Sequence, residues 1–362
     1  MKILIFSDIH IHPHKKSVER LEDCIKTLDW VFECAKENEI ENIIFLGDLF
    51  HDRQKIDVLT YQKTFEILEK HLLSNKIKLY LLLGNHDLWH NQKWDVSSVN
   101  PLRNLPGVSV LSEPCVRSIS DEYLFAFLPY THDPISDLKK IEKEWKIQCD
   151  KNKIDPPKLI GAHIAVDGAV WNVKYGTTAE VSIEHDGDMI KVGPNIFKKW
   201  DRVFLGHYHA EQQLSENVEY VGSPLQLSFG EAFQDKHIII YDLEKDNKTY
   251  IKNEFSPKHY IINEEELDKY ELEGNFIRLE VSDISSSTMT DVRKNLVENK
   301  KVATMEIKQA TIKETHNITD AKSILYKEDE MLEKYVDQAN MDLEKEKLIS
   351  IGKLICSCEE KQ

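Results

Sequence analysis

Five short motifs in this chain end an apolar run with residue types that bind cations. They are Asp8-Ile9-His10, Gly47-Asp48, Gly84-Asn85-His86-Asp87, Gly161-Ala162-His163 and Gly206-His207-Tyr208-His209. Together they supply carboxylates, an amide oxygen and imidazoles, which form a ligand set for two hard or borderline divalent cations held side by side. Two adjacent cations suit hydrolysis at a phosphorus centre above other reactions.

Each motif alone has an ordinary structural explanation. Gly-Asp is a common turn dipeptide, Asn-His-Asp could cap a helix, and most of the 15 histidines need do no chemistry. The combination favours a metal site, because every candidate ligand follows an apolar segment that predicts a buried strand, at 2–6, 43–46, 79–83, 159–160 and 203–205. The carboxyl ends of such strands converge on one crevice of an α/β sheet, where ligands bind.

The order of the motifs, D-x-H, G-D, G-N-H-D, G-x-H and G-H-x-H, resembles the calcineurin-like metallophosphoesterase superfamily over the first two-thirds of the chain. Within it, residues 47–51 (G-D-L-F-H) are similar to the second motif of the SbcD-type nuclease subunits of double-strand-break repair complexes. Residues 220–224 (Y-V-G-S-P) and 228–231 (S-F-G-E) also resemble that branch. The similarity is to bacterial and phage members, T-even phages included, which work with a large SMC-like ATPase, SbcC in bacteria.

The resemblance implies a role for each matching residue. One metal ion would be held by Asp8, His10, Asp48 and His209. The other would be held by Asp48, Asn85, His163 and His207, with Asp48 bridging the two. The resemblance implies manganese, and mixed N/O donors without a thiolate suit Mn²⁺, Fe²⁺ or Zn²⁺, with Mg²⁺ also open.

Two further histidines are catalytic candidates. By resemblance, His86 would lie over the scissile phosphate as an acid or electrostatic stabiliser, and His51 would be a further active-site histidine. Because His86 adjoins the ligand Asn85, it is placed to protonate the leaving oxygen. The alternative is that His86 is a metal ligand or a structural hydrogen-bonding group.

The remaining pattern places these motifs in a layered fold. Helical periodicity covers 17–38, 58–74 and 135–149, and further strands are expected at 123–130 and 237–243. Alternating β and α segments predict an α/β fold, a two-sheet layered metallophosphoesterase core flanked by helices. Residues 167–200 form a long insert whose glycines indicate loops at the mouth of the site.

Three domains are expected, at 1–255, 256–318 and 319–362. The first is the nuclease domain. The second is predicted as a small α+β cap, with an acidic linker at 264–266, a strand at 276–282, a serine-rich turn at 285–287, a helix at 290–299 and a strand at 302–309. Its position matches the DNA-binding cap of SbcD-type nucleases, although a domain of unrelated purpose is the alternative.

The third segment predicts an amphipathic helix or helix pair over 322–362. Its apolar positions at helical spacing are Leu325, Leu332, Val336, Ala339, Leu343, Leu348, Ile351 and Ile355. This stripe either docks on the chain's own core or enters a partner's coiled coil. The resemblance favours the ATPase partner.

Composition limits the class of protein. The chain has 362 residues, of which 41% are hydrophobic and 30% charged, and no apolar run approaches the ~20 residues of a membrane span. The chain enters a strand at once, so we expect no signal peptide, and its six cysteines form no C-x-x-C pair. A cytoplasmic protein without membrane contact is expected, in a bacterial host's cytoplasm if a phage encodes it.

The net charge of −16 conflicts with simple DNA binding, since DNA binders usually carry a basic face. Lys15 and Lys16 after the first motif, and Arg53 after the second, are candidate substrate-binding residues. Solvated loop charges are an equally good explanation for them. We expect two cations to offset the acidity locally and the partner to supply much of the grip on DNA.

Three hypotheses follow. The first is the nuclease subunit of an SbcCD-like complex, with 3′-to-5′ exonuclease activity on duplex ends and endonuclease activity on single strands. The resemblance adds a homodimer within a heterotetramer. The second is a calcineurin-like phosphatase or small-molecule phosphodiesterase, which the charge favours. The third, a non-catalytic scaffold that regulates the ATPase, ranks last because no ligand is missing.

Overall fold

The computed structural model describes residues 1–74, 76–90, 93–170, 192–281 and 286–309. The chain divides into two compact units, Met1–Ala310 and Thr311–Gln362. The second unit, with the predicted helical tail, lies outside the described residues, and so does most of the insert predicted at 167–200. The description that follows concerns the first unit.

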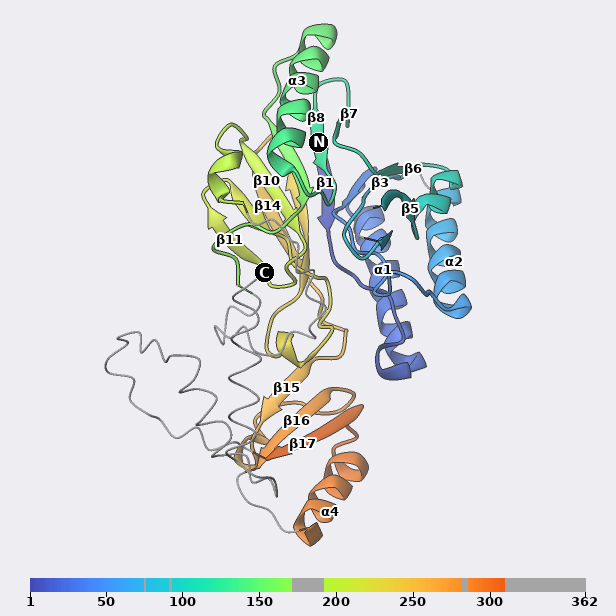
Figure 1. Ribbon diagram of the computed structural model, residues 1–362. Coiled ribbons are helices and arrows are strands. Elements are labelled where there is room, and N and C mark those ends of the chain that lie inside the picture. The colour runs from blue at the N-terminus through green and yellow to red at the C-terminus, as the bar shows by residue number, and fades with distance from the viewer. Residues whose placement is uncertain (75, 91–92, 171–191, 282–285, 310–362) are drawn as a thin grey trace, which may run out of the picture. The chain divides into compact units, whose positions relative to one another are not determined.

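Two six-stranded sheets form the centre of this unit (Figure 1). The first sheet has the order β14-β13-β1-β2-β3-β6. Its strands are β1 (Lys2–Phe6), β2 (Asn42–Phe45), β3 (Lys78–Leu82), β6 (Val108–Leu111), β13 (His237–Asp242) and β14 (Asn247–Lys252). The strands β1, β2, β3 and β6 run parallel, whereas β13 pairs antiparallel with β1.

The second sheet has the order β11-β12-β10-β9-β8-β7. Its strands are β7 (Cys115–Ser118), β8 (Leu124–Leu128), β9 (Leu159–His163), β10 (Arg202–Gly206), β11 (Gln212–Ser215) and β12 (Val218–Tyr220). Here β8, β9, β10 and β12 run parallel, and the edge strands β7 and β11 are antiparallel. The sequence predicted β8 and β13 as strands that extend or complete the sheets; both are interior strands.

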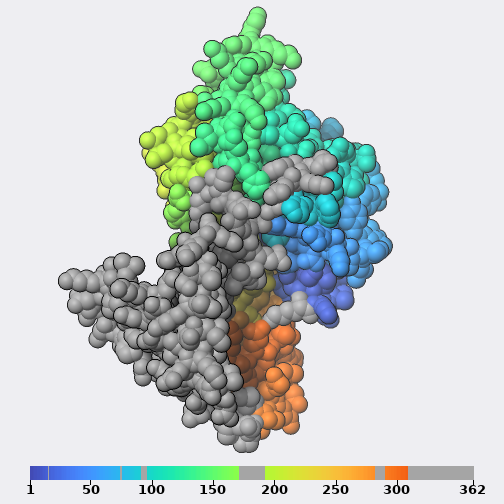
Figure 2. All heavy atoms as spheres, in the orientation of Figure 1, coloured from blue at the N-terminus to red at the C-terminus, as the bar shows by residue number. Residues whose placement is uncertain are grey.

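Helices cover the outer faces of both sheets. The predicted helices are confirmed as α1 (Val18–Glu37), α2 (Val58–Ser74) and α3 (Pro134–Asn152). The stripe of α1 packs with α2 on the first sheet, and α3 packs on the second. Ser17 caps α1 and Asp133 caps α3, each accepting a backbone hydrogen bond three residues on. The segment that contains α3 is drawn green in Figure 1, and its atoms form part of the green surface in Figure 2.

A third apolar layer lies between the two sheets. It joins Ile5 and Ile44 of the first sheet to Phe127 and Phe204 of the second, and all four side chains are fully buried. The order helix, sheet, sheet, helix confirms the predicted α/β layered core. Each face of a sheet is apolar, so neither can be left in water.

A separate three-stranded parallel sheet follows the core. It consists of β15 (His259–Ile262), β16 (Phe276–Val281) and β17 (Thr304–Gln309). Its own apolar cluster includes Ile277, Leu279 and Leu296, the last from the π-helical turn Asn295–Asn299. The predicted β-α-β unit is therefore present, and β15 adds a third strand. The predicted domain boundaries stay a prediction.

Two local expectations in this region are wrong. The three glutamates at Glu264–Glu266 form a short 3₁₀ helix between β15 and β16, capped by Asn263, instead of a linker. The helix α4 (Ser286–Lys294) begins inside the serine-rich segment predicted as a turn. Serine is favoured at helix starts as well as in turns, so composition alone could not separate the two.

The remaining elements are short and were not predicted. They are the hairpin β4 (Leu88–His90) and β5 (Lys93–Ser97), and the 3₁₀ helices η1 (His14–Lys16), η2 (Asn100–Asn104), η3 (Pro194–Phe197) and η4 (Phe229–Glu231). No helix in the described part of the chain is long and apolar enough to cross a membrane.

The contact between the two sheets can be tested at Gly161 of β9. An added Cβ would lie 2.6 Å from Leu46 Cδ2 and 3.1 Å from Phe125 Cε1. Gly161→Ala should therefore overpack this layer and lower the free energy of unfolding by about 1–3 kcal/mol. Denaturant unfolding of the metal-free protein measures it. Gly193→Ala is the control, because a Cβ added there would have no atom of the described residues within 4 Å beyond those of its chain neighbours. Equal stability of both variants would contradict the packing described.

Candidate metal centre

The seven predicted ligands come together at the carboxyl ends of parallel strands from both sheets. Asp8 and His10 follow β1, Asp48 follows β2 and Asn85 follows β3 in the first sheet. In the second sheet His163 ends β9, and His207 and His209 follow β10. Strands that are parallel within a sheet end at the same edge, and the two sheets pack on each other, so residues as far apart as Asp8 and His207, at 199 positions, meet.

The backbone at this edge adopts conformations that side chains rarely allow. Asp8, His10, Asp48 and His207 all have positive φ, at 52°, 46°, 62° and 103°. Such residues cost of order 1–3 kcal/mol each and persist only where the surroundings fix them. The fixing bonds include Asp8 N–H to Gly47 O at 3.0 Å and His10 N–H to Asp48 O at 3.1 Å.

Gly47 is required at this turn for two reasons. Its φ of +104° lies in the left-handed region, and a Cβ there would lie 2.6 Å from His163 Nδ1. The glycine therefore lets the second motif approach the fourth motif closely.

One group of donors surrounds His10. Its Nε2 lies 3.0 Å from His209 Nε2, 3.5 Å from Asp48 Oδ2 and 4.0 Å from Asp8 Oδ1. Asp8 is itself held in place by His207 N–H, which donates to Oδ2 at 2.9 Å. These are the four residues proposed for the first metal ion.

A second group surrounds Asn85. Its Oδ1 lies 3.0 Å from His163 Nε2 and 3.2 Å from His207 Nδ1. Asp48 Oδ2 lies 3.4 Å from the same His163 Nε2. One carboxylate oxygen of Asp48 thus contacts both groups, which is the arrangement expected of a bridging ligand.

All but one of these separations are close to those expected around a pair of divalent cations, the exception being the 4.0 Å between Asp8 Oδ1 and His10 Nε2. With metal–ligand distances of about 2.1 Å, neighbouring donors in a tetrahedral or octahedral shell lie about 3.0–3.4 Å apart. His163 Nδ1 lies 2.7 Å from Leu46 O, which can only accept, so Nδ1 carries the hydrogen and Nε2 is left as a donor atom for a metal. The residues present therefore fit the ligand roles predicted for them.

The buried carboxylates give this cluster negative charge that a bound cation would neutralise. Burial lowers the pKa of His10 and of His207 well below the usual value, so both imidazoles are neutral, as a metal ligand must be. Burial would also lower the pKa of His163, but Asp48 and Asp8 raise it to about 9. Without a metal ion, a proton on His163 therefore neutralises part of the carboxylate charge that a bound metal ion would neutralise.

Asp87 has a supporting role that the sequence did not reveal. Its Oδ2 accepts hydrogen bonds from Asp48 N–H at 2.8 Å and Gly84 N–H at 2.9 Å, and its Oδ1 accepts one from Leu49 N–H at 2.9 Å. Burial, with the nearby Asp48 charge, raises the pKa of Asp87 to about 7. Asp87, the last residue of the G-N-H-D motif, thus joins the second motif to the third by hydrogen bonds.

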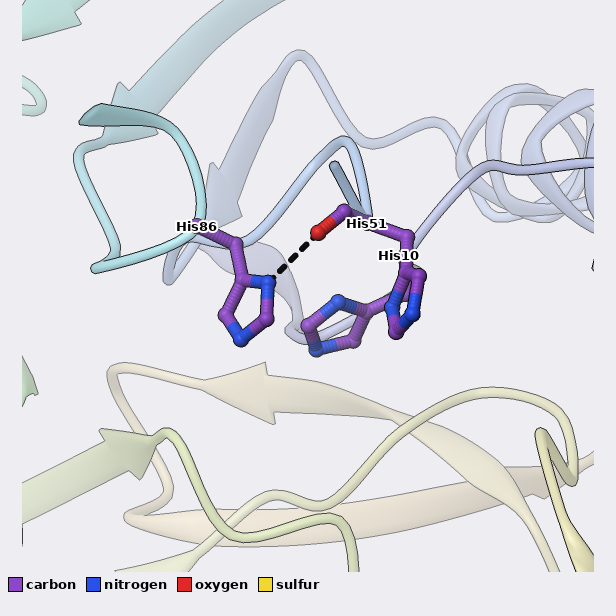
Figure 3. A group of neighbouring side chains, drawn as sticks. All are labelled: His10, His51 and His86. Atoms are coloured by element: carbon purple, nitrogen blue, oxygen red, sulfur yellow. Dashed lines mark hydrogen bonds between the residues drawn. The ribbon is translucent and has the colours of Figure 1, made fainter. Parts of the chain in front are cut away.

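His86 and His51 lie next to the first group (Figure 3). His86 Nδ1 lies 2.6 Å from His51 O, and His86 N–H donates to Asp48 Oδ1 at 2.8 Å. The His86 ring centroid is 4.7 Å from that of His10 and 5.6 Å from that of His51. Because nitrogens of all three rings lie within 4.8 Å of one another, the alternative of His86 as a ligand stays open.

The predicted basic residues lie on two adjoining loops. An isolated bridge between Ile11 and Phe50 places the segments after the first and second motifs side by side. Lys16 is exposed in η1, and Arg53 is half-buried in the second loop. The side chain of Lys15 lies outside the described part. The contact of these residues with substrate stays a prediction.

Comparison with known proteins agrees with the site. Residues 1–211 match the calcineurin-like phosphoesterase family, and the chain belongs to this family. It is therefore a metal-dependent phosphoesterase.

The finer resemblance to SbcD-type proteins is also confirmed. The chain is 26% identical over 267 residues to the SbcD component of the SbcCD nuclease of Staphylococcus saprophyticus, covering 69% of this chain and 67% of that protein. It is 25% identical over 255 residues to "Exonuclease subunit 1" of Enterobacteria phage T4, covering 70% and 68%. The SbcD component of the Bacillus subtilis SbcCD nuclease is 25% identical over 268 residues, covering 67% and 66%.

Asp48→Asn tests the shared ligand. Removing the charge next to both His10 and His163 should weaken both metal sites and abolish cleavage. Elemental analysis of the purified variant measures the bound metal. Asp52→Asn is the control, since Asp52 is half-exposed and pairs with His12 outside the ligand set. Two tightly bound ions per chain in Asp48→Asn would show that the ligand assignment is wrong.

Proposed function

We propose that this protein is a DNA nuclease subunit of the SbcD type, which hydrolyses phosphodiesters at the metal centre. The observation that carries the proposal is His51, which lies beside the catalytic candidate His86 and completes the G-D-L-F-H segment typical of that nuclease branch. The names of the bacterial and phage relatives support a nuclease over a phosphatase.

The seven ligands have a defined task in this proposal. Asp8, His10 and His209, with Asp48, hold one ion, and Asn85, His163 and His207, with Asp48, hold the other. When bound, two cations lower the pKa of a shared water and neutralise charge on the phosphate. We propose Mn²⁺ as the native ion.

His86 is proposed to donate a proton to the leaving oxygen. The hydrogen on its Nδ1 points to the carbonyl of His51, and its backbone N–H binds Asp48, so both the ring and its backbone are fixed. This leaves Nε2 to protonate the leaving oxygen. His51, whose pKa burial and the nearby His86 lower to about 4, is neutral near pH 7 and helps to hold the ring.

The proposed substrate is DNA, as duplex ends and single strands, and the proposed partner is an SMC-like ATPase in a complex that contains two copies of this chain. The net charge of −16 is the observation that favours the second candidate, a phosphatase or small-molecule phosphodiesterase. Parallel assays with DNA, a chromogenic phosphodiester and a phosphomonoester separate the two. Cleavage of the small substrates without DNA cleavage would overturn the nuclease proposal.

His86→Ser tests the proton donor. Its metal content should stay near that of the wild type, while the rate of DNA cleavage falls ~10²–10⁴-fold, because general acid catalysis is lost. Metal analysis and a nicking assay with Mn²⁺ measure both quantities. His90→Ser, at an exposed position four residues on, should change neither. Loss of one ion from His86→Ser would instead identify His86 as a ligand.

The full-length variant Leu332→Glu, Val336→Glu tests the proposed partner-binding segment. Two charges on the apolar stripe cannot be paired in an apolar groove, so co-purification with the ATPase should fail. The melting temperature and Mn²⁺-dependent nicking of single strands should persist. Lys334→Glu, which adds negative charge at a polar position, is the control. A sharp fall in melting temperature together with lost nicking would mean that this segment packs on its own core.

A further inference from the structure

A buried ion pair lies directly behind the candidate ligand His209. Lys236 Nζ is 2.6 Å from Glu231 Oε2, and the two side chains are only 6% and 7% exposed. Desolvation largely cancels the attraction in such a pair, so it is weak evidence for stability. Its position next to a metal ligand points to a different role.

Glu231 fixes the ring of His209. Its Oε1 lies 2.9 Å from His209 Nδ1, and since a carboxylate only accepts, that nitrogen carries the hydrogen. The opposite ring nitrogen, Nε2, then offers a lone pair, and it faces His10 Nε2 at 3.0 Å. Although burial favours the neutral acid, the Lys236 ammonium and the hydrogen bond from His209 hold the pKa of Glu231 well below its usual value, so it is a carboxylate.

Lys236 holds the backbone of the same ligand. Its Nζ donates to His209 O at 2.8 Å, to Ser223 Oγ at 2.8 Å and to Gln234 Oε1 at 3.0 Å. Ser223 N–H donates to His209 O at 3.1 Å. The pair therefore hydrogen-bonds His209 at two places: Glu231 contacts its ring, and Lys236 contacts its backbone carbonyl.

We propose that Glu231 and Lys236 are positioning residues that hold His209 as a metal ligand. Glu231 selects the tautomer and the plane of the ring, and Lys236 balances the buried charge while it fixes the carbonyl. Metal-binding histidines commonly donate their second ring N–H to such a carboxylate. The inference rests on the proposed role of His209 in the first metal site.

The main test is the full-length double variant Glu231→Gln, Lys236→Met. Replacing both charges leaves no unpaired ion, so this variant should fold even where Glu231→Gln alone, with Lys236 left unpaired, does not. Titration with Mn²⁺ by calorimetry should give two binding steps in the wild type. One step should weaken ~10–100-fold in the double variant and the other should be unchanged.

A second ion pair, with a buried glutamate and a partly exposed lysine, supplies the control. Glu219 Oε1 accepts from Lys248 Nζ at 2.8 Å and its Oε2 accepts from Tyr250 Oη at 2.9 Å, and the Glu219 side chain is 3% exposed. None of these partners is a candidate ligand. The variant Glu219→Gln, Lys248→Met should lose a similar ion pair and keep both Mn²⁺ steps.

The tautomer can be observed without any metal. Although burial opposes it, Glu231 raises the pKa of His209, so the spectrum must be recorded at a pH high enough for the ring to be neutral. Nitrogen NMR of the metal-free wild type should then show His209 with hydrogen on Nδ1, assigned by the signal lost in His209→Gln. In the double variant this single tautomer should give way to a mixture, because the carboxylate that selects it is gone.

Two results would overturn the proposal. One is a folded double variant with both Mn²⁺ steps and the tautomer of the wild type. The other is that the control variant weakens Mn²⁺ binding as much as the double variant does, at both steps. This would indicate general destabilisation. A wild type with the expected tautomer but no Mn²⁺ binding would instead remove the proposed metal site, and with it the role assigned to Glu231 and Lys236.

Discussion

The carboxylate of Asp48 is the contact on which the site depends. Its Oδ2 lies 3.5 Å from His10 Nε2 and 3.4 Å from His163 Nε2, and its Oδ1 accepts the backbone N–H of His86. A single side chain therefore joins strand ends from both sheets and the catalytic candidate. Two buried imidazole groups and a carboxylate can share so small a space only where charge is balanced, and a pair of cations would supply that balance.

Holding Asp48 there demands support from groups that are not ligands. Its φ of 62° is a costly backbone conformation for a residue other than glycine. Asp87 stabilises this turn by accepting hydrogen bonds from three backbone N–H groups. At the other side of the site, Glu231 holds His209 in the same manner through a ring nitrogen. The centre thus consists of carboxylates that face the proposed metals and buried carboxylates that fix the geometry of their neighbours.

Much of the fold could be predicted because its signals are local. Buried parallel strands such as β1 and β3 are continuous apolar runs, and α1 repeats its apolar residues at helical spacing, so both were identified. Short or edge strands such as β11 and β15 lacked a clear period and were missed. The candidate ligands could be proposed from the sequence because each lies at the end of such a strand or a few residues after it, which is a relation visible along the chain.

The sequence by itself therefore determined the family, the strands at the site and the residue types that are candidates for metal ligands. Only the tertiary structure decided which donors face one another and what supports them. Asp87 is adjacent to the ligands in sequence, yet its role depends on Leu49 and Gly84 backbone groups brought beside it by folding. Glu231 lies 22 residues from His209, and Lys236 27 residues. A hydrogen bond between such positions leaves no periodic or compositional trace, because it requires only that two chain segments meet in space.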